Sequence, residues 1–535
     1  MASFMLCDFP AAVEWFSSVV EREPNNADGF NNLGHVLSKL GRSQEAVEAL
    51  QRAVRLNPSL ADAYANLSGA LAALGRMDEA INAGQAALRI NPRLANAYVN
   101  LGSQYAECGM NREAVECFRR VVEIDPKHVG SWSNLLMALQ YSADLTTQDL
   151  YSAAAIWGQS QPQAPPDNRV WIQPERLRIG YVTADFCRHP SGYVMEKLVK
   201  SHDRSRVEVS CYGNLVGGDD ITERIRAHTD RYHQIAGLSD SETADLIRQD
   251  GIHVLVDLSG HTAGNRLGVF ALKPAPIQAT YMGYFGTTGL QQIDYIMRDP
   301  AQIPDDEARY YTESVYQLRD GAFSFNVTFG DGRSLVPPCV KNGFITFGSF
   351  HNLGKVSGQT LKAWADVLKS VPDSQFLLSR KAFNCDAVRQ RFLQLLGNQG
   401  VAAERIRFVV TGNRDEYLAL YDEVDIVLDT FPFNGSTTIY EALAMGVPTV
   451  ARSWDRMVGH FAESILGPCG HLDWVAKSDE EYVEIASRLA GDFEALTRMR
   501  VSLREDLLGS YLCNANQCAS TLEDAYWDMW RRFAV

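Results

Sequence analysis

The residues best suited to chemistry lie in four loops, each of which directly follows an apolar segment typical of a buried strand. The first loop holds Asp185 and His189, and the third holds Lys355. In open parallel sheets, ligands bind beyond the carboxyl ends of the strands. We therefore expect one ligand site to be surrounded by the four loops, which span residues 183–190, 259–266, 348–355 and 429–438.

The fourth loop has the pattern of a phosphate-binding turn. Gly435 allows the backbone to turn tightly, and Ser436, Thr437 and Thr438 then open a helix. A helix N-terminus presents free N–H groups and the positive end of the helix dipole, so it receives a phosphate readily. Glu441 follows within the next turn, from where a carboxylate can reach ribose hydroxyls. The spacing Thr438-x-x-Glu441 equally fits a capping box, and both interpretations stay open.

Lys355 and the pair Asp185 and His189 are the candidate catalytic groups. A lysine at the end of a strand can neutralise a diphosphate and stabilise it as a leaving group, although such a lysine is often simply solvated. His189 or Asp185 can act as a general base or orient a hydroxyl. A purely structural histidine before a proline is the alternative.

Motifs for several other reactions are missing from the sequence. It has no Asp-x-Asp to hold Mg²⁺ against a diphosphate, no Walker lysine loop and no G-x-S-x-G elbow. We therefore expect a reaction that needs no metal ion, and we assign no metal-binding residue. Phosphoryl transfer and serine hydrolysis are disfavoured.

Two series of alternating strands and helices must position these loops. The first series begins at Leu177 and the second at Gly343. Strands that alternate with helices predict parallel βαβ units, so we expect two Rossmann-like, doubly wound lobes with a cleft between them. A last helix has Tyr526, Trp530 and Phe533 on one apolar face, and we expect it to fold back across the lobes.

The N-terminal quarter of the chain is built from repeats. Each repeat has a proline, then an aromatic residue, then Asn-Leu, and the prolines stand 34 residues apart at Pro24, Pro58, Pro92 and Pro126. Gly41, Gly75 and Gly109 mark the turn inside a repeat. This period predicts tetratricopeptide helix pairs, which stack into a concave groove that binds polypeptides. A polypeptide partner is therefore expected.

The fold class that follows is α plus α/β, an α-solenoid followed by two doubly wound lobes. The expected divisions are repeats at 1–140, a linker helix and proline-rich linker at 141–175, a first lobe at 176–332, an interlobe linker at 333–342, a second lobe at 343–510 and a C-terminal helix at 511–535.

Composition restricts the partners and the compartment. The 535-residue chain has a formal net charge of −15, which argues against binding to a nucleic-acid backbone. It has neither an apolar run of membrane-spanning length nor an N-terminal signal pattern, so we expect a soluble protein without a membrane partner. Its ten cysteines stand singly, which is typical of buried thiols in a reducing cytoplasm.

Four long segments resemble one known family, the protein O-GlcNAc transferases with their relatives, the SPINDLY-type protein O-fucosyltransferases. The segments are RIGYVTADFCRHP, DLSGHTAGNRLGVFALKPAPIQATYMGYFGTTG, FITFGSFHNLGK and VLDTFPFNGSTTIYEALAMGVPTV. The resemblance implies a GT-B fold and inverting, metal-independent transfer of GlcNAc from UDP-GlcNAc to Ser or Thr hydroxyls of intracellular proteins. No cofactor beyond the donor substrate is implied.

The resemblance also assigns roles to residues of this sequence. His189 matches an active-site histidine, and Lys355 matches the lysine that holds the β-phosphate, with Asn352 nearby. The base-binding stretch matches Gly412, Asn413, Arg414 and Tyr417. The diphosphate loop matches Ser436, Thr437 and Thr438, and the acidic ribose ligand matches Glu441. The asparagines that grip the acceptor backbone match Asn32, Asn66, Asn100 and Asn134; ordinary solvent exposure is their alternative.

Several positions depart from the animal enzymes. Those enzymes carry histidine at the positions of Tyr417 and Ser436 and glutamine at that of Asn352. Ser436 and the Asp-Thr-Phe-Pro segment favour the fucosyl branch, whereas His189-Pro190 favours the GlcNAc branch. Two alternatives to GlcNAc transfer therefore stay open, a GDP-fucose-dependent transferase and a peptide-binding scaffold with vestigial lobes.

Overall fold

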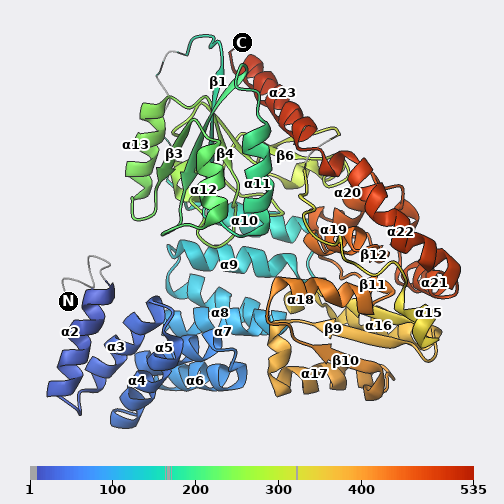
Figure 1. Cartoon of the computed structure of the whole chain (residues 1–535). Coiled ribbons are helices and arrows are strands. Elements are labelled where there is room, and N and C mark those ends of the chain that lie inside the picture. The colour runs from blue at the N-terminus through green and yellow to red at the C-terminus, as the bar shows by residue number, and fades with distance from the viewer. Residues whose placement is uncertain (1–8, 163, 165–168, 170, 321–322, 535) are drawn as a thin grey trace.

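The N-terminal part of the chain is a stack of antiparallel helices, shown in blue in Figure 1. The computed structural model describes residues 9–162, 164, 169, 171–320 and 323–534. The helices of the stack are α2 (Phe9–Arg22), α3 (Ala27–Lys39), α4 (Ser43–Leu56), α5 (Ala61–Ala73), α6 (Met77–Ile90), α7 (Ala95–Glu107), α8 (Asn111–Ile124), α9 (Val129–Gln140) and α10 (Thr147–Gln159).

This stack confirms the predicted repeats. Three helix pairs follow the single helix α2, and α9 begins a fourth pair. Helix α10 lies within the range 141–175, for which a linker helix was predicted, and it opens with a capping box between Thr146 and Asp149. The proline-rich stretch 161–176 lies partly outside the described residues.

The first lobe holds a seven-stranded parallel sheet in the order β3-β2-β1-β4-β5-β6-β7. Its strands are β1 (Leu177–Thr183), β2 (Val207–Gly213), β3 (Arg231–Gln234), β4 (Val254–Asp257), β5 (Ile277–Thr280), β6 (Tyr295–Arg298) and β7 (Ser314–Gln317). Its helices are α11 (Pro190–Ser201), α12 (Asp220–Ala227), α13 (Asp240–Asp250), α14 (Leu267–Ala271) and η1 (Ala308–Tyr310).

Alternate residues of β1 pack on opposite faces of this sheet. Ile179 and Tyr181 join a core with α11, α12 and the C-terminal helix α23 (Ala515–Phe533). Val182 joins a second core with α13 and α14, to which α9 and α10 contribute Leu139 and Trp157. The end of the repeat array is therefore part of the core of the first lobe.

The second lobe holds a six-stranded parallel sheet in the order β10-β9-β8-β11-β12-β13. Its strands are β8 (Thr346–Ser349), β9 (Gln375–Ser379), β10 (Ile406–Val409), β11 (Ile426–Leu428), β12 (Thr449–Arg452) and β13 (Val475–Ala476). Its longer helices are α16 (Gly358–Ser370), α17 (Asp386–Gly397), α19 (Thr437–Ala444), α21 (Asp479–Ala490) and α22 (Phe493–Gly509). Its shorter helices are α15 (Pro338–Asn342), η2 (Leu353–Lys355), η3 (Lys381–Asn384), η4 (Ala403–Arg405), α18 (Arg414–Ala419), η5 (Leu420–Glu423), η6 (Met457–Gly459), α20 (Phe461–Leu466), η7 (Leu472–Trp474) and η8 (Tyr511–Cys513).

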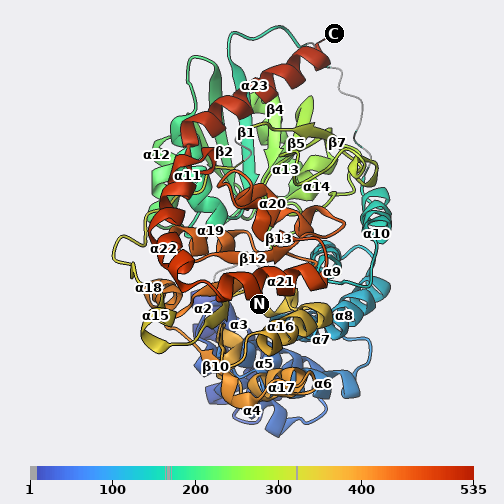
Figure 2. The same ribbon diagram turned by 90° about the vertical axis from the view of Figure 1, so that its right-hand side faces the viewer.

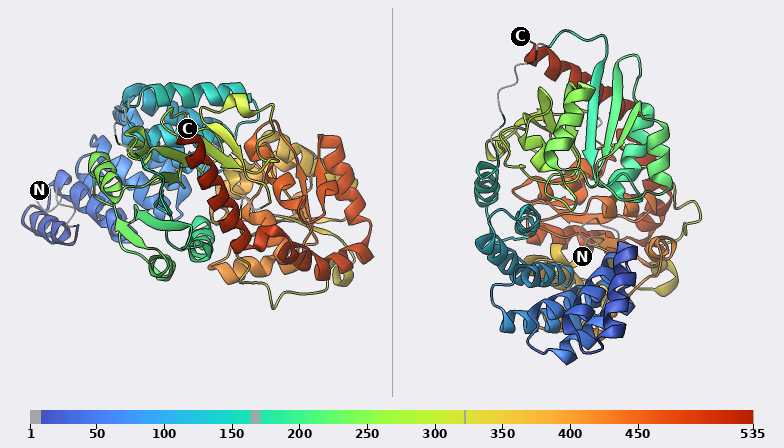
Figure 3. Two further views of the ribbon diagram at one scale, coloured as in Figure 1. Left: turned by 90° about the horizontal axis from the view of Figure 1, so that it is seen from above. Right: turned by 90° about the vertical axis from the view of Figure 1, so that its left-hand side faces the viewer.

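The two sheets confirm the prediction of two doubly wound lobes, because each reverses its strand order next to its first strand. Figure 2 shows α22 and α23 running from the second lobe up along the first, as expected for the last helix. Tyr526 and Trp530 of α23 are buried, whereas Phe533 is 44% exposed. Seen from above, the second lobe lies to one side of the repeats, and the first lobe lies over them (Figure 3). No helix within the described ranges is both long and apolar enough to cross a membrane.

Candidate functional site

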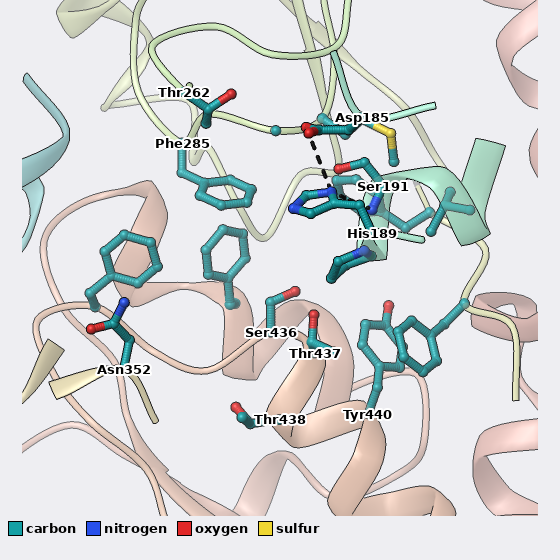
Figure 4. Close-up of a pocket in the computed structure, with 18 of the residues that line it drawn as sticks. Asp185, His189, Ser191, Thr262, Phe285, Asn352, Ser436, Thr437, Thr438 and Tyr440 are labelled. Carbon is teal, nitrogen blue, oxygen red and sulfur yellow. Dashed lines mark hydrogen bonds and ion pairs between the residues drawn. The ribbon is translucent and has the colours of Figure 1, made fainter. Parts of the chain in front are cut away.

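A cavity of about 540 Å³ lies where the switch points of the two sheets face each other. The four predicted loops all contribute to its lining. Asp185 and His189 follow β1, Thr262 follows β4, and Asn352 and Lys355 follow β8. Ser436, Thr437 and Thr438 reach it from the segment after β11. Figure 4 shows the residues of the first lobe facing those of the second lobe across this space.

Lys355 lies on the wall of the cavity that belongs to the second lobe. Its Nζ donates to the main-chain oxygen of Asn434, 2.8 Å away, and lies 3.9 Å from the centre of the Phe433 ring. Desolvation lowers its pKa to about 7, although nearby Asp429 acts in the opposite direction. An ammonium held this close to the turn before α19 can neutralise an anion bound at that turn.

The N-terminus of α19 opens toward the same cavity. Ser436 is the N-cap residue, and its side chain makes no capping hydrogen bond. The Ile439 N–H donates to the main-chain oxygen of Ser436 at 3.0 Å, whereas those of Thr437 and Thr438 have no partner within the described residues and are left for a ligand. The alternative of a Thr438–Glu441 capping box is wrong, because Glu441 bonds to groups from α18 instead and Thr438 lies inside the helix.

A buried network holds this turn in place. His351 Nε2 lies 2.7 Å from Asp429 Oδ1 and 2.9 Å from Thr438 Oγ1, while its Nδ1 lies 2.9 Å from Ser349 Oγ. Asp429 Oδ1 also accepts from the Gly435 N–H at 2.7 Å. Burial lowers the pKa of His351, and Asp429 partly offsets this. The neutral imidazole thus donates through Nε2 and accepts from Ser349.

This proton arrangement leaves the hydroxyl hydrogen of Thr438 free to donate into the cavity. No role was predicted from the sequence for His351 or Asp429. A carboxylate that ends an apolar strand was the available signal for Asp429. The contact with His351 depends on how two distant loops meet, and no spacing in the sequence shows it.

The residues matched to nucleoside binding form a neighbouring cluster outside the lining of the cavity. Glu441, which is 2% exposed, accepts from the Tyr417 hydroxyl at 2.9 Å and pairs with Arg414 at 2.9 Å. Burial raises the pKa of Glu441, and Arg414 opposes the shift. Gly412 and Asn413 are exposed, and Asn413 caps α18. The structure therefore joins Tyr417, Arg414 and Glu441 through side-chain contacts.

Asp185 and His189 form an open pair on the opposite wall. His189 Nδ1 lies 3.6 Å from Asp185 Oδ2 and accepts from the Ser191 N–H at 3.3 Å. The His189 side chain is 46% exposed. Burial raises the pKa of Asp185, and His189 partly offsets this. Because Nδ1 accepts from Ser191 and lies beside Asp185, these two neighbours fix the ring, and the pair can receive or orient a hydroxyl proton.

The four asparagines of the repeats are placed differently from one another. Asn32 is exposed. The Asn66 amide donates to Asn31 Oδ1 at 2.9 Å, and the Asn100 amide donates to the main-chain oxygen of Ala65 at 2.8 Å. Asn134 lines a second cavity, of about 500 Å³, between the repeats and the second lobe.

The second cavity adjoins the first. Asn352 and Arg380 line both of them, and Asn352 also caps η2 by accepting from the Gly354 N–H. Arg380, which follows β9, was missed by sequence reasoning. Its Nε is buried and makes no hydrogen bond within the described part of the chain. The second cavity thus lies next to the cleft, between the repeats and the second lobe.

Comparison with known protein families decides the membership of the chain. The profile described as Glycosyl transferase family 41 matches residues 159–337 and 339–522, and two tetratricopeptide repeat profiles match 31–95 and 95–128. The chain belongs to glycosyl transferase family 41. The two matched stretches cover both lobes. All residues that line the cavity between the lobes therefore lie within the family 41 match, and so do the loops that the resemblance singled out.

Relatives and a solved structure agree with this membership. A tomato (Solanum lycopersicum) protein described as a probable UDP-N-acetylglucosamine–peptide N-acetylglucosaminyltransferase SPINDLY is 36% identical over 75% of this chain. An Arabidopsis thaliana protein described likewise, but as SEC, is 33% identical over 66% of it. The chain spans 44% and 37% of these two relatives.

The solved structure is a lysine-to-methionine mutant of the Thermobaculum terrenum O-GlcNAc transferase. It is 31% identical, and the match covers 95% of this chain and 98% of the other with a TM-score of 0.86. The arrangement of repeats and two lobes is therefore the GT-B fold of a known member, as the resemblance implied.

Proposed function

We propose that this chain transfers N-acetylglucosamine from UDP-GlcNAc to Ser or Thr hydroxyls of proteins, with inversion at the anomeric carbon. The observation that carries the proposal is the shared cavity, in which Lys355 and the open N-terminus of α19 lie on one wall. The names of the plant relatives support UDP-GlcNAc as the donor, and the name of the bacterial structure supports GlcNAc as the transferred sugar.

In the proposed reaction, the acceptor oxygen attacks the anomeric carbon while the bond from that carbon to the β-phosphate oxygen breaks. Negative charge then grows on the departing diphosphate. Lys355, the N–H groups of Thr437 and Thr438, and the Thr438 hydroxyl are placed to stabilise this charge. Asp185 and His189 face Thr437 and Thr438 from the other lobe (Figure 4), where they orient the acceptor or receive its proton.

The remaining residues are proposed to hold the two substrates. Tyr417 and the backbone at 412–414 contact the base, and Glu441 contacts the ribose. Asn352 lies beside the diphosphate. The asparagines of the repeats, namely Asn32, Asn66, Asn100 and Asn134, contact the acceptor backbone, and the second cavity passes the acceptor into the cleft. We place the reaction in the cytoplasm, in keeping with the unpaired thiols of the described cysteines.

The test is incubation of the purified chain with a cell lysate and either UDP-GlcNAc or GDP-fucose, followed by mass analysis of modified peptides. We expect N-acetylhexosamine on Ser or Thr with UDP-GlcNAc and no product with GDP-fucose. Deoxyhexose from GDP-fucose would instead assign the fucosyl branch. Absence of nucleotide binding together with absence of product would leave only a peptide-binding scaffold.

A further inference from the structure

The repeat array touches the turn that carries Lys355. Gly109, in the turn between α7 and α8, has a φ of +72°, and a Cβ built there would lie 2.9 Å from the main-chain oxygen of Leu353. Leu353 begins η2, the single helical turn that ends at Lys355. Backbone therefore meets backbone at this point, and even one methyl group would force a shift.

A second contact reaches the same turn from α9. The ring of Tyr141, which follows α9, lies 5.2 Å from the ring of Phe433, and Phe433 lies directly under the Lys355 ammonium. A Cβ added to Gly354 would lie 3.3 Å from the main-chain oxygen of Ala106 and 3.5 Å from the Tyr141 ring. The turn formed by η2, which we call the lysine turn, thus packs against the repeats as well as against its own lobe.

The second lobe holds this part of the array firmly. Arg391 of α17 donates to the main-chain oxygens of Cys108 at 3.0 Å and Gly109 at 3.2 Å. Cys385 contacts Asp78 at 3.1 Å. Met77 and Cys108 of the repeats belong to the buried core of the second lobe. Figure 1 shows the α7–α8 end of the array against this lobe.

We propose that the repeat array positions Lys355, so that donor binding depends on the α7–α8 turn in addition to any hold on the acceptor. The inference rests on the proposed function, in which Lys355 meets the diphosphate. It assigns Gly109, which lines neither cavity, as a positioning residue that acts through η2. Tyr141 acts in the same way through Phe433, and it also lines the second cavity. An array that only tethers the acceptor would affect the acceptor KM and leave UDP binding unchanged.

Equivalent glycines in the earlier repeats provide a matched control for Gly109. Gly41, Gly75 and Gly109 occupy equivalent turns with φ values of +73°, +76° and +72°. A Cβ at Gly41 or Gly75 meets nothing within 4 Å. Gly75→Ala and Gly109→Ala therefore carry the same cost of a left-handed alanine, whereas only Gly109→Ala presses on the lysine turn.

The experiment measures UDP affinity by calorimetry, together with kcat and acceptor KM, for the wild-type chain and both variants. We expect Gly109→Ala to weaken UDP binding and lower kcat by about tenfold or more, with an unchanged acceptor KM. Gly75→Ala should match the wild type in all three. Equal UDP affinity and kcat in the two variants would overturn the inference, whereas a wild type that binds no UDP would overturn the proposed function itself.

A second pair of variants covers the case in which Gly109→Ala does not fold. Arg391→Met removes the two hydrogen bonds from Arg391 to main-chain oxygens of the α7–α8 turn. Arg389→Met, on the same helix, removes a donor to the main-chain oxygen of Phe383 within the lobe. We expect only Arg391→Met to weaken UDP binding, and equal affinities would contradict the positioning role.

Discussion

The two walls of the central cavity are built in different ways. On the wall of the second lobe, His351, Asp429 and Thr438 are fixed by a buried network, and Lys355 is held by a main-chain oxygen. On the wall of the first lobe, His189 is 46% exposed and lies 3.6 Å from Asp185. We infer that the wall receiving the diphosphate is fixed before binding, whereas the wall facing the acceptor is left open for a protein chain to enter.

The largest expected effect is the loss of Lys355. Lys355→Met should lower kcat for transfer by about 100- to 1,000-fold, because it removes a cation aimed at charge that develops on the leaving group. Steady-state transfer to a protein acceptor measures this. The matched control is Lys362→Met on α16, which removes an exposed lysine paired with Asp366. Activity that survives in the Lys355 variant would remove the lysine from the mechanism.

The next effect tests how rigid the wall of the second lobe is. A Cβ at Gly435 would lie 2.2 Å from Thr438 Oγ1 and 2.6 Å from His351 Nε2. Gly435→Ala should therefore displace the turn before α19, which is proposed to bind the diphosphate, and lower kcat/KM for the donor by about 100-fold. Gly358→Ala is the control, since a Cβ there meets nothing within 4 Å. If both variants behave alike, the turn is not as tightly built as we describe.

The wall of the first lobe should respond differently. His189→Asn keeps a side chain that can cap α11 but removes the imidazole. We expect kcat to fall by about 10- to 100-fold while the affinity for UDP stays unchanged. His128→Asn is matched to it, because His128 also caps a helix by accepting from Ser131. A loss of UDP affinity in the His189 variant would place this histidine at the donor and contradict the division between the walls.

The smallest effect is a dependence on pH. Lys355 has a pKa of about 7, so it is mostly charged below pH 7 and mostly neutral above it. The affinity for UDP-GlcNAc should fall as the pH rises through 7, by up to about tenfold per unit, because the diphosphate binds the charged form and raises this pKa. Calorimetry at pH 6 and pH 8 measures it, with Lys355→Met as the control that abolishes the dependence. An affinity that is flat across this range would show that Lys355 does not meet the diphosphate.

Most of the fold could be predicted because its signals are local. The recurring prolines and glycines of the repeats stand at one period, and strands such as β1 and β4 are apolar runs because both of their faces are buried. β3 has the sequence RYHQ at the edge of its sheet, so it lacks the apolar run and was missed. β13 has only two residues, too few for any pattern to show.

The site was predictable only in part, for a related reason. The ends of buried strands located the loops with Asp185, Lys355 and Ser436. The partner of Glu441 could not be read from spacing, because Tyr417 and Arg414 come from α18 and override the local capping pattern. The contacts of His351 with Asp429 and of Gly109 with Leu353 likewise join segments that are far apart in the chain.

In the proposed reaction, a nucleotide diphosphate lies between Lys355 and the first turn of α19. A crystal structure of the chain with UDP tests it most directly. We expect a β-phosphate oxygen within hydrogen-bonding distance of Lys355 Nζ and of the main-chain N–H of Thr437 or Thr438. UDP bound anywhere else, or a cleft left empty at saturating UDP, would contradict it.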